Sequence, residues 1–296
     1  MKSKWTKWLA QPGHILAVSL DATDLMKEMG NIHNFNGFAV GGFSEAIIGT
    51  LLVSSSHKTG ESININAQGS GYFKQAIVDC SPDGKVRGFM IEQSDPSMRT
   101  FGIEGNAGPW GTGILSVLYT KSSEGKVPYT GMVPISTGIL DDAFNEYYKD
   151  SAQSTAKVGF FVDVKENELV SAHGVLIQTL GGANEDEVQA VSNLNVKHLR
   201  ELAKWSADQN VFKNKLSLTL PGPNFSLVEE TPVLTFCNCS QDRIERALIL
   251  AGEDDMIDAI GNDPTLDVSC DFCCKQYKVS AERLKALYTK DRTKLQ

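Results

Sequence analysis

The 296-residue sequence has no apolar run of the roughly 20 residues needed to span a bilayer. Its basic start, MKSKWTKWLAQPGH, is interrupted by Gln11, Pro12 and Gly13 too early for the apolar region of a secretory leader. Basic residues are also scarce, since 28 Lys and Arg face 36 Asp and Glu, giving a net charge of −8. This balance argues against binding nucleic acid through a basic surface. We therefore expect a cytoplasmic protein with no membrane and no nucleic-acid partner.

Signatures of catalysis are missing as well. The stretch GNAGPWGTG lacks the Gly-Lys-Ser/Thr of a phosphate-binding loop, and no HxE precedes a PCxxC as in the zinc deaminases. The five histidines are scattered without the spacing of metal ligands: His14, His33, His57, His173 and His198. We expect no catalytic residues and a protein that is not an enzyme.

The first 183 residues favour an α+β fold. Strand-like runs bounded by turn residues occur at 14–23, 61–80, 85–93, 113–120, 127–135 and 154–164. The apolar stretch 37–58 predicts a buried helix, and 139–154 predicts a second helix with Asp141 and Asp142 at the positive end of its dipole. Because helices and strands do not alternate strictly, we expect an N-terminal domain of mixed sheet and helix, residues 1–183.

Residues 184–235 have a different pattern. They begin polar and acidic and then become amphipathic, with apolar residues at Leu194, Leu199 and Leu202. The pattern predicts a helical connector. The following LSLTLPGPNFSLVEETPV contains Pro221 and Pro223, which favour an extended or turning link.

Five of the six cysteines lie in the last fifth of the chain. Cys237 and Cys239 form a CxC, and after 30 intervening residues Cys270 and Cys273 form a CxxC. A CxxC alone also occurs in dithiol oxidoreductases, but two such pairs match a closed, tetrahedral zinc site of four thiolates. Thiols stay reduced in the cytosol, so clustered cysteines there more often bind metal than form structural disulfides. We expect one Zn²⁺ per chain in the reduced state.

The residues between the two pairs predict a small, mostly helical module, 236–296. Ser240 can cap a helix whose apolar face is Ile244, Ala247, Leu248 and Ala251, with Gly252 ending it. The stretch that follows has no basic residue and is rich in carboxylates: Glu253, Asp254, Asp255, Asp258, Asp263, Asp267 and Asp271. Because such a segment has little core, we expect the metal to supply most of its folding free energy, about 10 kcal/mol or more.

The CxC also indicates redox chemistry. A disulfide between Cys237 and Cys239 closes a very small, strained ring, so it should form and break reversibly. Zinc-bound cysteines are thiolates, the form that peroxide and hypochlorite attack. We expect oxidation to join Cys237 with Cys239 and Cys270 with Cys273, which leaves the zinc without ligands.

These motifs resemble a known family. The segments FCNCSQDRIERALILAGEDDM, CDFCCKQY and VSAERLKAL, with GKVRGFM, GTGILSV, VPYTGMVPI, EYYKDSAQS and HGVLIQTL upstream, are similar to the thirty-three-kilodalton heat shock family of redox-regulated chaperones. The resemblance implies an ATP-independent holdase that is a zinc-bound, inactive monomer when reduced. Oxidation would unfold, dimerise and activate it to bind unfolding client proteins. The resemblance also implies that the four zinc thiolates are Cys237, Cys239, Cys270 and Cys273.

The chain departs from the family pattern at two positions. Cys274 follows the CxxC where the family often has Gly, at a place where a residue without Cβ fits best. It is either an extra thiol in the disulfide chemistry or a bystander. Ala152 replaces the usual acidic residue between Ser151 and Gln153. Cys80, before the SPDG turn, is interpreted as a structural thiol at a strand end.

Two other functions stay open. A binding protein with a purely structural zinc module would keep its zinc in peroxide, and a dithiol oxidoreductase using Cys270 and Cys273 would reduce insulin. For a chaperone, client binding requires apolar surface uncovered by unfolding. The connector residues Leu194, Leu199, Leu202 and Trp205, with the sheet they cover, are the predicted client surface.

Overall fold

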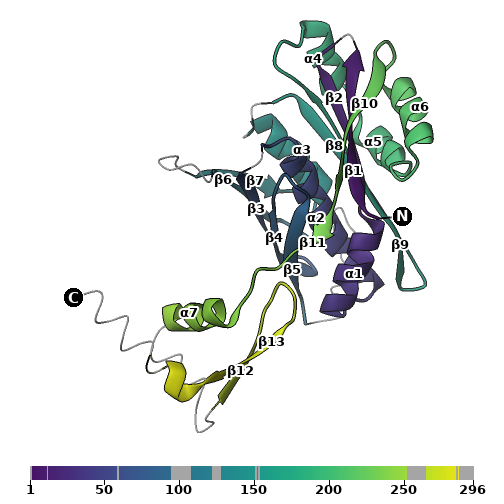
Figure 1. Cartoon of the computed structure of the whole chain (residues 1–296). Coiled ribbons are helices and arrows are strands. Elements are labelled where there is room, and N and C mark those ends of the chain that lie inside the picture. Colours follow the sequence, from purple (N-terminus) through teal and green to yellow (C-terminus); the bar gives the residue numbers. More distant parts are fainter. Residues whose placement is uncertain are drawn as a thin grey trace. The chain divides into compact units, whose positions relative to one another are not determined.

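The computed structural model describes residues 2–11, 13–58, 60–94, 108–121, 128–150, 152, 154–251, 265–284 and 286. The chain divides into two compact units, Met1–Phe236 and Cys237–Gln296 (Figure 1). The mixture of sheets and helices confirms the predicted α+β class.

The first unit contains a five-stranded antiparallel sheet in the order β10-β1-β2-β9-β8. Its strands are β1 (Lys4–Gln11), β2 (Ile15–Asp21), β8 (Ala156–Lys165), β9 (Glu168–Thr179) and β10 (Asn224–Pro232). β1 was not predicted, because the charges of this segment hide its alternation. Trp5 and Trp8 are nevertheless buried, at 0% and 3% exposure.

The second sheet has six strands in the order β11-β5-β4-β3-β6-β7. They are β3 (Glu61–Gly69), β4 (Phe73–Cys80), β5 (Lys85–Glu92), β6 (Gly113–Lys121), β7 (Tyr129–Ile135) and β11 (Leu234–Thr235). The predicted turn between β4 and β5 is confirmed, since the Gly84 amide donates to the Ser81 carbonyl at 2.9 Å. Gly84 has φ +82°, which favours glycine.

Helix α2 (Gly37–Ser55) lies at the centre of this unit and packs against strands of both sheets. It begins at Asn36, whose side chain accepts from the Ala39 amide at 3.0 Å. By length and composition α2 could cross a membrane, with a mean hydropathy of 1.5 over a window that is 83% buried. A core helix that is apolar all round has the same composition. Helix α1 (Thr23–His33), which was not predicted, also joins this core.

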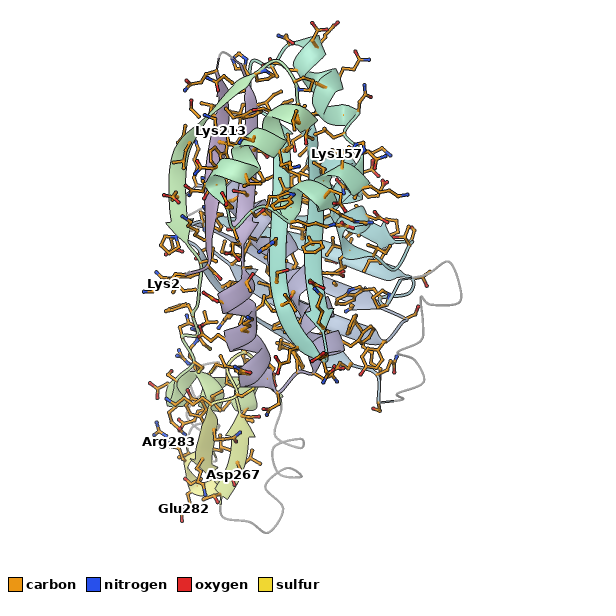
Figure 2. All side chains as sticks on the ribbon, turned by 90° about the vertical axis from the view of Figure 1, so that its right-hand side faces the viewer. Lys2, Lys157, Lys213, Asp267, Glu282 and Arg283 are labelled. Carbon is orange, nitrogen blue, oxygen red and sulfur yellow. The ribbon has the colours of Figure 1, made fainter. Side chains whose placement is uncertain are left out.

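The five-stranded sheet has a separate core on each face. Val18 and Leu20 of β2 face the core around α2, whereas Ile15 and Ala17 face the opposite one. The opposite core is covered by α4 (Glu185–Ser192), α5 (Val196–Ala203) and α6 (Gln209–Thr219). Figure 2 looks onto this layer, with Lys213 of α6 and Lys157 of β8 labelled.

The connector is therefore part of the first unit. The segment 216–233, expected to be an extended or turning link, is the end of α6 followed by β10, which pairs with β1 along its whole length. Phe225 of β10 is fully buried in the core beneath the helices. Sequence reasoning missed this strand because its hydrogen-bond partner lies more than 200 residues away in the chain.

Helix α3 (Leu140–Asp150) covers the edge strand β8. Asn145 Oδ1 accepts from the Val158 amide at 2.9 Å, and its Nδ2 donates to the Val158 carbonyl at 3.0 Å. Asp141 Oδ2 accepts from the Phe160 amide at 3.3 Å. Side chains of α3 thus satisfy backbone groups that an edge strand would otherwise leave open.

The second unit combines α7 (Gln241–Ala251) with a hairpin of β12 (Thr265–Ser269) and β13 (Gln276–Ser280). The helical module expected from the sequence therefore also contains a two-stranded sheet. The sequence does alternate at Leu266, Val268, Tyr277 and Val279, but the two runs are short. Gly252 and the acidic residues from 253 to 263 lie outside the described residues.

Candidate metal centre

The first cysteine pair lies between β11 and α7. The Ser240 hydroxyl accepts from the Arg243 amide at 3.3 Å, which confirms the predicted cap. Cys237 and Cys239 thus lie immediately before the capped start of the helix, and both are half-buried.

The second pair lies in the turn between β12 and β13. The Cys270 amide donates to the Lys275 carbonyl at 3.0 Å, and the Cys274 amide donates to the Cys270 carbonyl at 2.8 Å. These two bonds fold the CxxC back on itself. Cys270 is 6% exposed, the most buried of the four sulfur-bearing residues at the site.

The four sulfur atoms form one cluster, all within 4.8 Å of one another. Cys237 Sγ lies 3.8 Å from Cys270 Sγ, and Cys239 Sγ lies 3.4 Å from Cys273 Sγ. Tetrahedral coordination with metal–sulfur bonds near 2.3 Å requires sulfur atoms about 3.8 Å apart. The donor set and its spacing therefore fit one four-coordinate, thiophilic metal ion.

The thiols have unequal acidity. Burial opposes ionisation of Cys239, but hydrogen bonds from Tyr277 and from the neighbouring thiols lower its pKa to about 7. Burial, together with neighbouring thiols, raises the pKa of Cys273 to about 12. Burial also raises the pKa of Cys270, against the effect of the Phe272 and Cys273 amides.

Tyr277 is a site residue that sequence reasoning missed. Its hydroxyl donates to Cys239 Sγ at 3.0 Å, and this bond, with burial, raises the pKa of Tyr277 to about 12. The phenol therefore stays a donor. The sequence did contain a signal for Tyr277. In the alternating run after the CxxC, Tyr277 and Val279 lie on the same side of the strand.

The unit around the cysteines has a small core. Only Val279 and Leu284 are fully buried among its described apolar residues, with Ile244, Leu248 and Leu266 partly buried against them. A core of this size gives limited stability by itself.

Comparison with known proteins identifies the family. A family model described as Hsp33 protein matches residues 3–280. A 33 kDa chaperonin from Limosilactobacillus fermentum is 34% identical over 97% of this chain and 99% of its own length. The chain belongs to the Hsp33 protein family. Another 33 kDa chaperonin, from Latilactobacillus sakei, is 30% identical over the same shares of the two chains.

A solved structure shows the same fold. The crystal structure of the 33 kDa chaperonin (heat shock protein 33 homolog) from Thermotoga maritima has a TM-score of 0.77 and covers 99% of both chains. At 18% identity, this similarity concerns the fold alone.

The two departures from the Hsp33 pattern have clear positions. Cys274 is exposed, lies outside the sulfur cluster and has φ 56°, the conformation that favours glycine. Ala152 is partly buried against the core around α2. Cys80 is buried at the end of β4, and burial raises the pKa of its thiol to about 12.

The four predicted client-binding residues differ in exposure. Leu199 and Leu202 are buried, at 0% and 3% exposure, beneath the helical layer. Leu194 is partly buried against the same core, whereas Trp205 is 42% exposed. Three of the four would thus become accessible only if α4, α5 and α6 left the sheet, and their role in client binding stays a prediction.

Proposed function

We propose that this protein is a redox-regulated, ATP-independent holdase that is inactive when reduced and zinc-bound. The observation that carries the proposal is the cluster of four cysteine sulfurs on a unit with little core of its own. Family membership and relatives named chaperonins support a chaperone rather than an enzyme. A cluster of cysteines that must stay reduced to bind metal suits the cytoplasm, where we place the protein.

Cys237, Cys239, Cys270 and Cys273 would hold one Zn²⁺, which when bound keeps the four sulfurs as thiolates and joins α7 to the hairpin. The distances favour this set, and Cys274 lies outside it. In the bound state the Tyr277 hydroxyl is placed to donate to the Cys239 thiolate. Such a hydrogen bond withdraws charge from the sulfur and orients it.

Oxidation would convert the ligands into disulfides. Peroxide oxidises one cysteine to a sulfenic acid as its O–O bond breaks, and the partner thiol then displaces water from that sulfur. Two thiols and one hydrogen peroxide thus give one disulfide and two waters. We propose the pairs Cys237 with Cys239 and Cys270 with Cys273.

The choice of pairs decides what oxidation does to the unit. The sulfur contacts of 3.8 and 3.4 Å run between the two segments, 33 and 34 residues apart in sequence. A disulfide across either contact would tie α7 to the hairpin and stabilise the unit by about 3–4 kcal/mol. The proposed pairs lie within each segment and leave no such link, so the unit would unfold.

Client binding would follow from exposure of the sheet beneath the connector. Trp8, Ile15 and Ile177 lie buried in the core that α4, α5 and α6 cover. Once uncovered, they would present a continuous apolar sheet face of the kind that unfolding polypeptides bind. The same face would also support pairing of two oxidised chains, from a reduced monomer to an oxidised homodimer.

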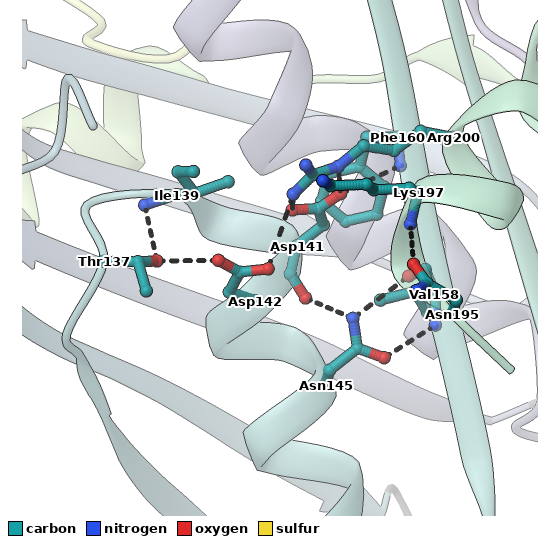
Figure 3. Close-up of polar contacts among 10 residues, drawn as sticks. All are labelled: Thr137, Ile139, Asp141, Asp142, Asn145, Val158, Phe160, Asn195, Lys197 and Arg200. Atoms are coloured by element: carbon teal, nitrogen blue, oxygen red, sulfur yellow. Dashed lines mark hydrogen bonds and ion pairs between the residues drawn. The ribbon is translucent and has the colours of Figure 1, made fainter. Parts of the chain in front are cut away.

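The helical layer is held to the rest of the first unit by a partly buried ion pair (Figure 3). Arg200 of α5 donates to both carboxylate oxygens of Asp141, from Nε at 2.7 Å and from Nη2 at 2.6 Å. The Asp141 side chain is only 3% exposed. Gly159 of β8 allows the close approach, because a Cβ there would lie 2.6 Å from the Leu199 Cβ. Release of α5 would leave Asp141 buried without its cation, so the layer resists undocking until it is destabilised.

Zinc release and disulfide mapping test the proposal. The reduced, zinc-loaded chain is treated with hydrogen peroxide in the presence of a chromophoric zinc chelator, and its disulfides are mapped by mass spectrometry. We expect one zinc released per chain and the two pairs within segments. If zinc stays bound after peroxide treatment, the redox switch is excluded and the zinc has a structural role only.

Two variants check the ligand assignment. Cys270→Ser should lose tight zinc binding, because it removes one of four ligands. Cys274→Ser, outside the cluster, should keep one zinc per chain. Full stoichiometry in Cys270→Ser would contradict the assigned ligands.

A further inference from the structure

A cavity of about 540 Å³ lies in the first unit, and none of its described lining residues belongs to α4, α5 or α6. The end of α2, strands β6 and β7, helix α3 and the end of β9 each contribute to its walls. Its volume falls in the range of small-ligand sites, about 300–1,000 Å³. The redox switch makes no use of it.

The walls are rich in tyrosine. Four of the seven tyrosines of the chain line this one cavity: Tyr119, Tyr129, Tyr147 and Tyr148. Tyr129 is 49% exposed, whereas Tyr147 and Tyr148 are 4% exposed. The His57 ring packs against Tyr119 at 4.8 Å between centroids. Aromatic walls of this kind favour a flat ring that can stack or meet them edge to face.

Two polar groups of the wall have fixed orientations. The Ser56 hydroxyl donates to Gln178 Oε1 at 3.1 Å, which leaves the Gln178 amide nitrogen as a donor. His57 Nδ1 contacts the Val53 carbonyl at 2.8 Å, and because a carbonyl only accepts, Nδ1 carries the proton. With the proton on Nδ1 alone, Nε2 can act as an acceptor. Gln178 is 9% exposed, and its amide forms part of the wall.

None of the described residues that line the cavity is an Asp, Glu, Lys or Arg. An uncharged ligand therefore enters without leaving an unpaired charge behind, and its polar edge can use one donor and one acceptor.

We propose that this cavity binds an uncharged aromatic ring with a polar edge, supplied by a Tyr or Trp side chain of an unfolded polypeptide. The ring packs among the tyrosines, and the adjoining peptide group bonds to Gln178 and His57. Only the source of the ring, an unfolded polypeptide, rests on the proposed chaperone function. It gives the first unit an anchoring site that is open while α4, α5 and α6 are still docked.

Ligand-observed NMR tests the site on the reduced, zinc-loaded full-length chain. The compounds are N-acetyl-L-tyrosinamide, p-cresol as the ring alone, and N-acetyl-L-leucinamide as an apolar control. We expect the tyrosinamide to bind, more tightly than p-cresol, and the leucinamide to give no saturation transfer. Tyr129→Ser and Gln178→Leu should each weaken tyrosinamide binding about threefold to tenfold.

Met132→Ala is the matched control variant. Met132 is exposed on β7 like Tyr129, but three residues along a strand it lies on the opposite face. The Met132→Ala variant should bind the tyrosinamide as tightly as the parent chain does.

Three results would overturn the site. They are equal binding of the leucinamide, no binding of the tyrosinamide, and unchanged affinity in Tyr129→Ser and Gln178→Leu variants that melt like the parent chain. Tighter binding of p-cresol than of tyrosinamide would overturn the polypeptide as its source. Because these measurements involve no oxidant and no aggregating client, they succeed or fail independently of the redox switch.

Discussion

Cys274 has a backbone conformation that residues with a Cβ seldom adopt. Its φ of 56° occurs in the turn that positions Cys270 and Cys273. For a residue other than glycine this conformation costs roughly 1–2 kcal/mol. The cost is borne by the metal-binding turn, so it should weaken metal binding and favour release.

Replacing Cys274 with Gly should therefore strengthen zinc binding, by about fivefold to thirtyfold if the whole cost is recovered. Competition with a chromophoric chelator measures the change. Cys274→Ser, which keeps a Cβ, should bind zinc like the parent chain and separates backbone strain from loss of the thiol. Lys275→Gly, at the next position in the turn, should not strengthen binding. An unchanged affinity in Cys274→Gly would show that the turn stores no strain.

Glu45, in the first unit, is a second residue with a measurable effect, in this case on the pH dependence of stability. Burial, then the negative charge of Asp141, raises the pKa of Glu45 from its usual 4.5 to about 8. Its Oε2 is buried without a hydrogen-bond partner among the described residues. Since the folded state holds this proton more tightly than the unfolded state, the contribution of Glu45 to stability is fully present below pH 4.5 and is lost as pH rises to about 8.

Glu45→Gln should remove this loss of stability. We expect the variant to melt at least a few degrees higher than the parent chain at pH 8, because 1 kcal/mol corresponds to about 2–4 °C in a domain of this size. At pH 5 the two melting temperatures should be closer. Differential scanning calorimetry of the reduced protein at the two pH values measures this, and a pH-independent difference would contradict the assigned titration.

At this scale the sequence revealed the four cysteines but not their hydrogen-bond partner. The CxC and CxxC predict a four-sulfur cluster because ligand type and pairing are local features. Tyr277 reaches Cys239 only because β13 turns back beside α7, across 38 residues. The Arg200 pair with Asp141, 59 residues apart, was likewise beyond local patterns.

At the scale of elements, α5 is the helix on which activation should depend. It carries Leu199 and Leu202 into the core over the sheet and Arg200 into the ion pair with Asp141. Breaking a buried pair on one side leaves the other charge unpaired, which costs about 3–5 kcal/mol when both groups are fully buried. The Arg200 side chain is 32% exposed, so the lower end applies.

Arg200→Gln should destabilise the docked layer by about 3 kcal/mol and lower the temperature at which the oxidised protein becomes active. Hydrogen exchange of the α5 and β8 amides, with client aggregation recorded over a temperature series, measures both effects. Lys197→Gln is the control, since Lys197 is exposed on the same helix and its side chain forms no ion pair among the described residues. Equal effects of the two substitutions would exclude the ion pair as a stabiliser of the layer.

Elements with strong local signals were predicted well. The apolar stretch 37–58, the acidic start of α3 and the Gly84 turn all match the structure. The pairing of β10 with β1 and the β12–β13 hairpin were missed. Their strands are short or charged, and their stability comes from partners that only the folded chain brings together.

At the scale of the whole molecule, two units differ in what stabilises them. The first has two extensive cores, one on each face of the five-stranded sheet. The described residues of the second include two fully buried apolar side chains and a four-sulfur cluster. A bound metal would therefore govern the stability of the second unit, while burial of apolar surface governs that of the first.

Removing the metal should unfold one unit without the other. A strong chelator added to the reduced chain should unfold the second unit and leave the first folded. Circular dichroism should fall by only a small fraction, and the buried Trp5, Trp8 and Trp110 of the first unit should keep their fluorescence. Loss of the tryptophan signal on chelation alone would mean that the units do not unfold independently.

The most direct test of the central claim is light scattering from a thermally unfolding client protein, mixed with this protein in two states. One sample is reduced and zinc-loaded, and the other is pretreated with peroxide at a mildly raised temperature. We expect only the oxidised sample to suppress the scattering, and a reductant with zinc to restore the inactive state. Equal suppression by both samples, or none by either, would contradict a redox switch and leave the cysteine cluster as a structural metal site.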